Sequence, residues 1–77
     1  MPLKVFISGA SSGIGAALAR HYAAQGAALG LAARRAAPMQ TLADSLSVPV
    51  CVYALDVTDS AALGAAVQDF IARHGVP

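Results

Sequence analysis

Apolar and polar positions alternate along this chain in blocks, with three short apolar runs separated by three longer segments of helical spacing. The apolar runs cover residues 3–8, 27–33 and 50–55. Strands that are apolar on both faces are typical of parallel sheets covered by helices on each side. The pattern therefore predicts an α/β fold in the order strand, helix, strand, helix, strand, helix.

The first helical segment follows a glycine-rich run and is expected to begin near Gly13. Ile14, Leu18 and Tyr22 recur every four residues and predict an apolar stripe that lies on the sheet. Gly26 follows the last periodic residue and is expected to end the helix as its C-cap.

The second helical segment is short, and prolines mark both of its sides. Pro38 suits an early helical position, and Pro49 precedes the next strand. The apolar face of this helix is predicted to consist of Met39, Leu42 and Leu46.

The third helical segment has the clearest signals. Thr58 or Asp59 can cap its start, and Gly75 can end it. Asp69 and Arg73 stand four residues apart and can pair at the surface. The apolar face is predicted to consist of Leu63, Val67, Phe70 and Ile71.

Right-handed crossovers between parallel strands predict the spatial order 3-2-1. This order leaves the first strand at an edge, although its sequence is nearly continuous in apolar residues, as in a strand that is paired on both sides. We therefore expect a fourth strand beside it, and we interpret residues 1–77 as the first part of a longer single domain.

The composition agrees with a piece of a larger domain. Of the 77 residues, 57% are hydrophobic and 12% are charged, against about 25% charged residues in typical domains. The net charge is +1 and the only basic cluster is Arg34-Arg35, so we expect no nucleic-acid partner. No apolar stretch has the length and character of a signal peptide or a membrane helix. We expect a cytoplasmic protein without a membrane partner.

The remaining reactive side chains do not form a recognisable centre. Cys51 lies between two valines, cannot form an internal disulfide, and is expected to pack as a small hydrophobic residue. His21 and His74 lie on separate helical segments without Cys, Asp or Glu at ligand spacing. We predict no metal site.

The run from Ser8 to Gly15, SGASSGIG, joins the first strand to the first helix. A glycine-rich turn that leads into a helix presents backbone N–H groups and the positive end of the helix dipole to an anion. Gly9 permits the turn, Gly13 lets a pyrophosphate approach, and Gly15 lets the helix lie close to the sheet. No lysine follows the last glycine, which excludes a P-loop. The alternative is a merely flexible glycine and serine loop.

This run resembles the T-G-x-x-x-G-I-G signature of the short-chain dehydrogenase/reductase family, with Ser8 in place of the usual threonine. The resemblance implies a Rossmann-type, doubly wound parallel sheet, of which this chain is the first half only. It also implies that the loop residues Ser11 and Ser12 contact the cofactor. The backbone N–H of Ile14 would bind the pyrophosphate while its side chain packs inward.

The end of the second strand determines which dinucleotide fits. A carboxylate there accepts from the ribose 2′-hydroxyl of NAD, but by the family pattern Ala33 stands in its place. Arg34 and Arg35 follow and supply guanidinium groups that can hold a 2′-phosphate. NADP is therefore favoured over NAD, although Ser12 stands where many NADP-dependent relatives carry a basic residue. The alternative for both arginines is a solvated loop.

Asp56 and Val57 follow the third strand and resemble the adenine-binding pair of the family. The resemblance implies that the Asp56 carboxylate accepts from the adenine amino group and that the backbone of Val57 contacts the ring. From the residues alone, Asp56 reads as a carboxylate in a turn at the strand end.

The family's catalytic residues are expected beyond residue 77. Neither Tyr22 nor Tyr53 has a lysine four positions later, so the Tyr-x-x-x-Lys pair is absent from these residues. The resemblance implies a parent oxidoreductase that transfers a hydride between NADP(H) and a carbonyl or alcohol substrate, and that is a homo-oligomer. The alternatives are a non-catalytic dinucleotide sensor or binding module, and a fragment that acts alone.

Overall fold

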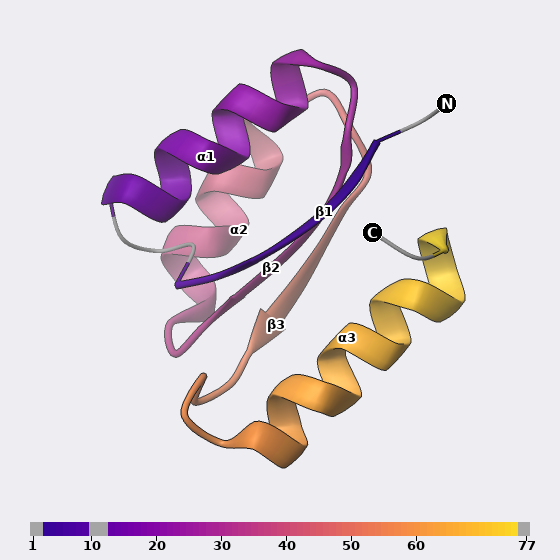
Figure 1. The fold of residues 1–77 in the computed structure, drawn as a ribbon. Helices are drawn as coiled ribbons and strands as arrows, with labels where there is room; N and C mark the ends of the chain where they lie inside the picture. Colours follow the sequence, from indigo (N-terminus) through magenta and orange to yellow (C-terminus); the bar gives the residue numbers. More distant parts are fainter. Residues whose placement is uncertain (1–2, 10–12, 76–77) are drawn as a thin grey trace.

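The computed structural model describes residues 3–9 and 13–75, which form three strands and three helices in strict alternation (Figure 1). This order confirms the one predicted from the apolar pattern. The elements are β1 (Lys4–Ser8), α1 (Gly13–Ala24), β2 (Ala28–Ala33), α2 (Ala36–Asp44), β3 (Val50–Ala54) and α3 (Ser60–His74).

All strand pairs are parallel, and the sheet has the order β1-β2-β3, with β2 in the middle. These are the neighbours that the predicted order 3-2-1 requires. Helices α1 and α2 cover one face of the sheet and α3 covers the other (Figure 1). The described residues therefore form a Rossmann-like α/β arrangement with helices on both faces.

The stripe predicted for α1 is confirmed at Tyr22, which packs against the hydrophobic core, and is wrong at Ile14 and Leu18. Ile14 is 78% exposed and Leu18 is 43% exposed, whereas Gly15 and Ala19 are buried. The buried positions are again four apart, but they carry the small side chains. A helix with glycine and alanine toward the sheet can lie close to the strands, and its neighbouring large residues are then turned outward.

The face below α1 and α2 holds the main hydrophobic cluster. Its centre is Leu29 and Leu31 of β2, which are fully buried together with Met39 of α2. Leu42 is buried and Leu46 packs against the cluster, so the predicted apolar face of α2 is confirmed. Central strand β2 is the most completely buried element, as expected for a strand covered on both faces.

The opposite face is built from aromatic rings. Phe70 of α3 is fully buried, and its ring meets that of Phe6 edge to face, with centroids 5.7 Å apart. Both rings lie over Gly30 of β2, where a Cβ atom would be 2.5 Å from Phe6 Cδ2 and 2.9 Å from Phe70 Cδ1. A residue without a side chain is therefore required at Gly30 for the rings to fit.

The helix ends follow the sequence signals. Gly26 and Gly75 have φ angles of 81° and 89°, a conformation that favours glycine after a helix. Asp59 is the N-cap of α3, and its carboxylate accepts from the Ala62 N–H at 3.1 Å. Across residues 3–9 and 13–75, no helix has both the length and the apolar character needed to cross a membrane.

Candidate cofactor-binding site

The register of the sheet brings the ends of all three strands into one row. Ser8 lies beside Ala32, and Ala33 lies beside Ala54. Backbone hydrogen bonding to β2 continues one residue beyond the end of β1, because the Gly9 N–H donates to the Ala32 carbonyl at 2.7 Å. The three segments named as candidates for cofactor binding therefore meet at the carboxyl edge of the sheet, where parallel α/β folds bind their ligands.

Two glycines of the glycine-rich segment, Gly9 and Gly13, lie in the part of the chain that the structure describes. Gly9 has a φ of 74°, so the turn off β1 uses a conformation that favours glycine. Gly13 is exposed at the start of α1, and a Cβ there would meet nothing within 4 Å. Among the described residues, therefore, no packing contact requires glycine at position 13. The space beside its Cα is open to a ligand. Ser11 and Ser12 lie outside the described residues.

The start of α1 also presents the helix N-terminus. First-turn N–H groups have no carbonyl partner within their own helix, and the dipole is positive there. Gly15 is buried in α1, consistent with its expected role in close packing on the sheet. The Ile14 side chain does not pack inward as expected, because Gly15 occupies the sheet-facing position.

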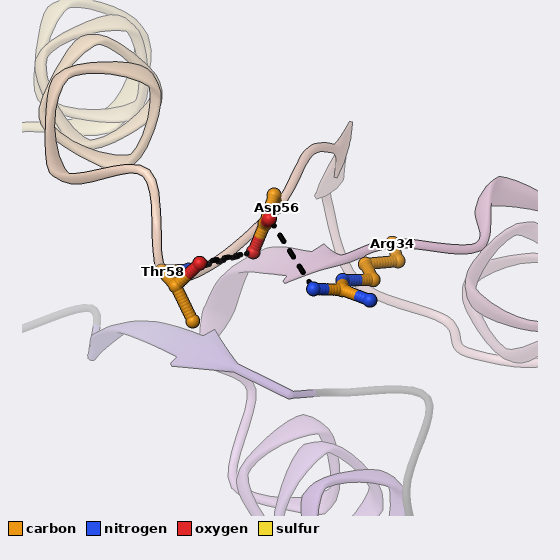
Figure 2. A network of polar contacts seen from close by, with 3 residues as sticks. All are labelled: Arg34, Asp56 and Thr58. Carbon is orange, nitrogen blue, oxygen red and sulfur yellow. Dashed lines mark hydrogen bonds and ion pairs between the residues drawn. The ribbon is translucent and has the colours of Figure 1, made fainter.

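Arg34 follows β2 directly and forms an ion pair with Asp56 after β3, with Nη2 and Oδ2 3.2 Å apart (Figure 2). The other carboxylate oxygen of Asp56 accepts from Thr58 twice, from the backbone N–H at 2.9 Å and from the hydroxyl at 2.7 Å. These Thr58 hydrogen bonds, and then the Arg34 charge, lower the pKa of Asp56 below its ordinary value. Asp56 is therefore an anion at neutral pH.

The alternative interpretation of Asp56 as a turn carboxylate is thus confirmed, and its role toward adenine stays a prediction. Thr58 was expected only as a possible helix cap, a position that Asp59 takes. An Asp followed two residues later by a hydrogen-bonding N–H is typical of an Asx turn, and this spacing was the available signal.

The two remaining candidates lie close to the same edge. Arg35 is the N-cap residue of α2, is exposed, and makes no capping hydrogen bond with its side chain. Val57 is half-buried in the turn between Asp56 and Thr58. The site therefore offers two guanidinium groups, one carboxylate and a helix N-terminus, with no acid at Ala33.

A second group of polar side chains lies between β3 and α3. The Tyr53 hydroxyl donates to Asp69 at 2.6 Å, and Arg73 donates to the same oxygen at 2.8 Å, so the predicted surface pair of Asp69 and Arg73 is confirmed. Cys51 is half-buried, with its Sγ 3.4 Å from His74 Nε2. Within residues 3–9 and 13–75, no three Cys, His, Asp or Glu side chains gather as a metal site would require.

Comparison with known proteins agrees with this geometry. A model of the family described as short chain dehydrogenase matches residues 4–76. Sulfoacetaldehyde reductase from Chromohalobacter salexigens is 48% identical over an alignment of 65 residues that covers 82% of this chain and 26% of that protein. The chain belongs to the short-chain dehydrogenase family.

Solved structures of related enzymes share the fold. An alcohol dehydrogenase from the archaeon Thermococcus sibiricus, complexed with 5-hydroxy-NADP, has a TM-score of 0.85 and 32% identity, over 97% of this chain and 34% of that one. L-sorbose reductase from Gluconobacter frateurii, complexed with NADPH and L-sorbose, has a TM-score of 0.83 and 31% identity, over 96% and 30%. The chain thus spans about a quarter to a third of these relatives.

Proposed function

We propose that residues 1–77 are the cofactor-binding first part of a longer, NADP-dependent short-chain dehydrogenase/reductase. The observation that carries the proposal is the meeting of Gly9, after β1, and Arg34, after β2, at one edge of the sheet, with Ala33 in place of an acid. The two solved relatives compared above were complexed with NADPH or a modified NADP. NAD is the weaker candidate because no carboxylate follows β2 directly.

The residues fit a dinucleotide in chemical terms. The N-terminus of α1 suits the pyrophosphate, and Gly13 leaves the approach open. The Arg34 guanidinium suits a 2′-phosphate, with Arg35 as a second cation, and Asp56 and Val57 are the residues proposed to contact the adenine. The nicotinamide would carry the hydride between the cofactor and a carbonyl or alcohol substrate.

Exposed large apolar side chains and an open strand edge support the assignment to a longer domain. Leu3, Ile14 and Leu18 are 41%, 78% and 43% exposed, and β1 has a neighbour on only one side among the described strands. A further strand beside β1 would cover its open edge. The substrate-binding and catalytic groups would then come from residues that follow this chain.

The substitution Gly13→Val in the full-length protein tests the cradle. We expect NADPH and NADH binding to fall by more than about a hundredfold, because the new side chain would occupy the path of the pyrophosphate. Binding is measured by titrating the fluorescence of the reduced nicotinamide.

Gly64→Ala is the matched control, since a Cβ at Gly64 of α3 also meets nothing within 4 Å. It should leave both affinities unchanged. Unchanged binding in Gly13→Val would place the cofactor elsewhere. Binding without any hydride transfer to a panel of aldehydes and ketones would favour the non-catalytic sensor instead.

A further inference from the structure

The contact between Arg34 and Asp56 bears directly on which cofactor the site prefers. Nη2 of Arg34 belongs to both two-donor edges of the guanidinium, one shared with Nη1 and one shared with Nε. Asp56 Oδ2 lies 3.2 Å from this nitrogen. A bidentate phosphate needs two adjacent donors, so the carboxylate occupies part of one edge that a 2′-phosphate would use.

The carboxylate is the more firmly held of the two partners. Oδ1 of Asp56 accepts two hydrogen bonds from Thr58, only two residues away, so the local turn fixes the carboxyl group (Figure 2). The Arg34 side chain has this one side-chain contact among the described residues and is 73% exposed, against 45% for Asp56. When a ligand arrives, the arginine can turn away, and the carboxylate stays.

We propose that Asp56 moderates cofactor specificity by acting as an internal counter-ion that competes with the 2′-phosphate for Arg34. The inference rests on the proposed NADP site. It assigns to Asp56 a role distinct from any contact with adenine: the carboxylate lowers the advantage of a ligand that carries a 2′-phosphate over one that lacks it. Asp56 is in this sense a positioning residue, because it acts through Arg34.

The size of the effect follows from the exposure of the pair. Exposed ion pairs in proteins are weak. Removing the pair is therefore expected to change the affinity of Arg34 for a 2′-phosphate by about twofold to fivefold. Asp56→Asn removes the charge and keeps an oxygen that can accept from Thr58. The turn is therefore retained while Arg34 is released.

The test compares two ligands that differ only in the 2′-phosphate, 2′,5′-ADP and 5′-AMP, by isothermal titration calorimetry on the full-length protein. A lost contact with adenine weakens both ligands equally and cancels in the ratio of their affinities. We expect Asp56→Asn to raise the preference for 2′,5′-ADP about twofold to fivefold. In the Arg34→Ala background, the same substitution should leave the ratio unchanged.

Asp69→Asn is the matched control, since it makes the same change in the second Asp–Arg pair, on α3. It should leave the ratio as in the wild type. A ratio that stays unchanged or falls in Asp56→Asn, or that rises equally with and without Arg34, overturns the counter-ion role. In those cases the proposed site stands if the wild type prefers 2′,5′-ADP. A wild type that binds neither ligand overturns both proposals.

Discussion

Two networks of the same chemical composition lie in different parts of the molecule. Each places an aspartate between an arginine and a hydroxyl group. The strand-end network consists of Arg34, Asp56 and Thr58, and the helix network consists of Tyr53, Asp69 and Arg73. Their surroundings differ, and this difference separates a candidate binding site from a structural contact.

The carboxylates use their oxygens differently. Asp56 accepts two hydrogen bonds from Thr58 on one oxygen and one from Arg34 on the other, so the two partners do not share an oxygen. Asp69 receives Tyr53 and Arg73 on a single oxygen, which ties β3 to α3. The strand-end network lies where the three strands end. Position in the sheet, rather than the types of side chain, therefore distinguishes the two.

The comparison is tested most strongly by removing the two arginines in turn. We expect Arg34→Ala to weaken NADPH binding about tenfold to a hundredfold, through loss of charge-assisted hydrogen bonds to the 2′-phosphate. NADH binding should change little. Fluorescence titration of the full-length protein measures both.

Arg73→Ala serves as the control and should leave both affinities unchanged. Equal weakening of NADPH and NADH by Arg34→Ala would refute the phosphate assignment. A loss of binding in Arg73→Ala would show that the helix network is not purely structural.

A smaller effect is expected from removing the two hydroxyl groups. Tyr53→Phe deletes the hydrogen bond from a half-buried ring to Asp69 and should lower the free energy of unfolding by about 1 kcal/mol. Thr58→Val should cost less, because the Thr58 N–H still donates to Asp56. Urea denaturation measures both. A larger loss for Thr58→Val than for Tyr53→Phe would show that the strand-end network contributes more to the free energy of unfolding than the helix network does.

The change that is smallest near neutral pH is the effect of Tyr53 ionisation on the free energy of unfolding. Partial burial, and then the hydrogen bond to Asp69, raise the pKa of Tyr53 above its ordinary value. The folded state thus favours the neutral phenol, and this stabilisation is lost as the pH rises above about 10. The free energy of unfolding, followed from pH 7 to 11, should fall less steeply in Tyr53→Phe. An identical slope would contradict the shift.

The carboxylates have the opposite dependence. Hydrogen bonds from Thr58 lower the pKa of Asp56, and one from Tyr53 lowers that of Asp69. A lowered pKa stabilises the folded state at neutral pH, and this contribution is lost as the pH falls below about 4. Asp56→Asn and Asp69→Asn should each reduce the loss of stability on acidification. Variants that titrate like the wild type would show that neither carboxylate is shifted.

The sequence was sufficient for the elements and the strand order, because apolar runs, caps and crossover handedness are local or topological signals. It failed in part for α1, where Ile14 and Leu18 were predicted to lie on the sheet together with Tyr22, and only Tyr22 packs against the core. The helix instead turns Gly15 and Ala19 toward the sheet. Close approach of a helix and a sheet favours small residues, and a periodicity of large ones does not reveal this.

The pairing of Arg34 with Asp56 was also out of reach from the sequence. The two residues are 22 positions apart, on segments that follow different strands. Their contact depends on the register of β2 and β3, which sets both side chains at the same edge. The sequence motifs predict that Arg34 contacts a 2′-phosphate and that Asp56 contacts the adenine. Only the structure shows that the two side chains form an ion pair with each other.

The close packing of Phe6 and Phe70 over Gly30 makes substitutions at these three positions depend on one another. Because a Cβ there would lie within 3.0 Å of both aromatic rings, a larger residue at Gly30 requires both Phe6 and Phe70 to move or to become smaller. A smaller side chain at either of those two positions alone leaves a cavity in the sheet face below α3. Exchanging the aromatic pair for a side chain on β2 therefore requires several substitutions made together, and each of them alone is expected to lower the free energy of unfolding.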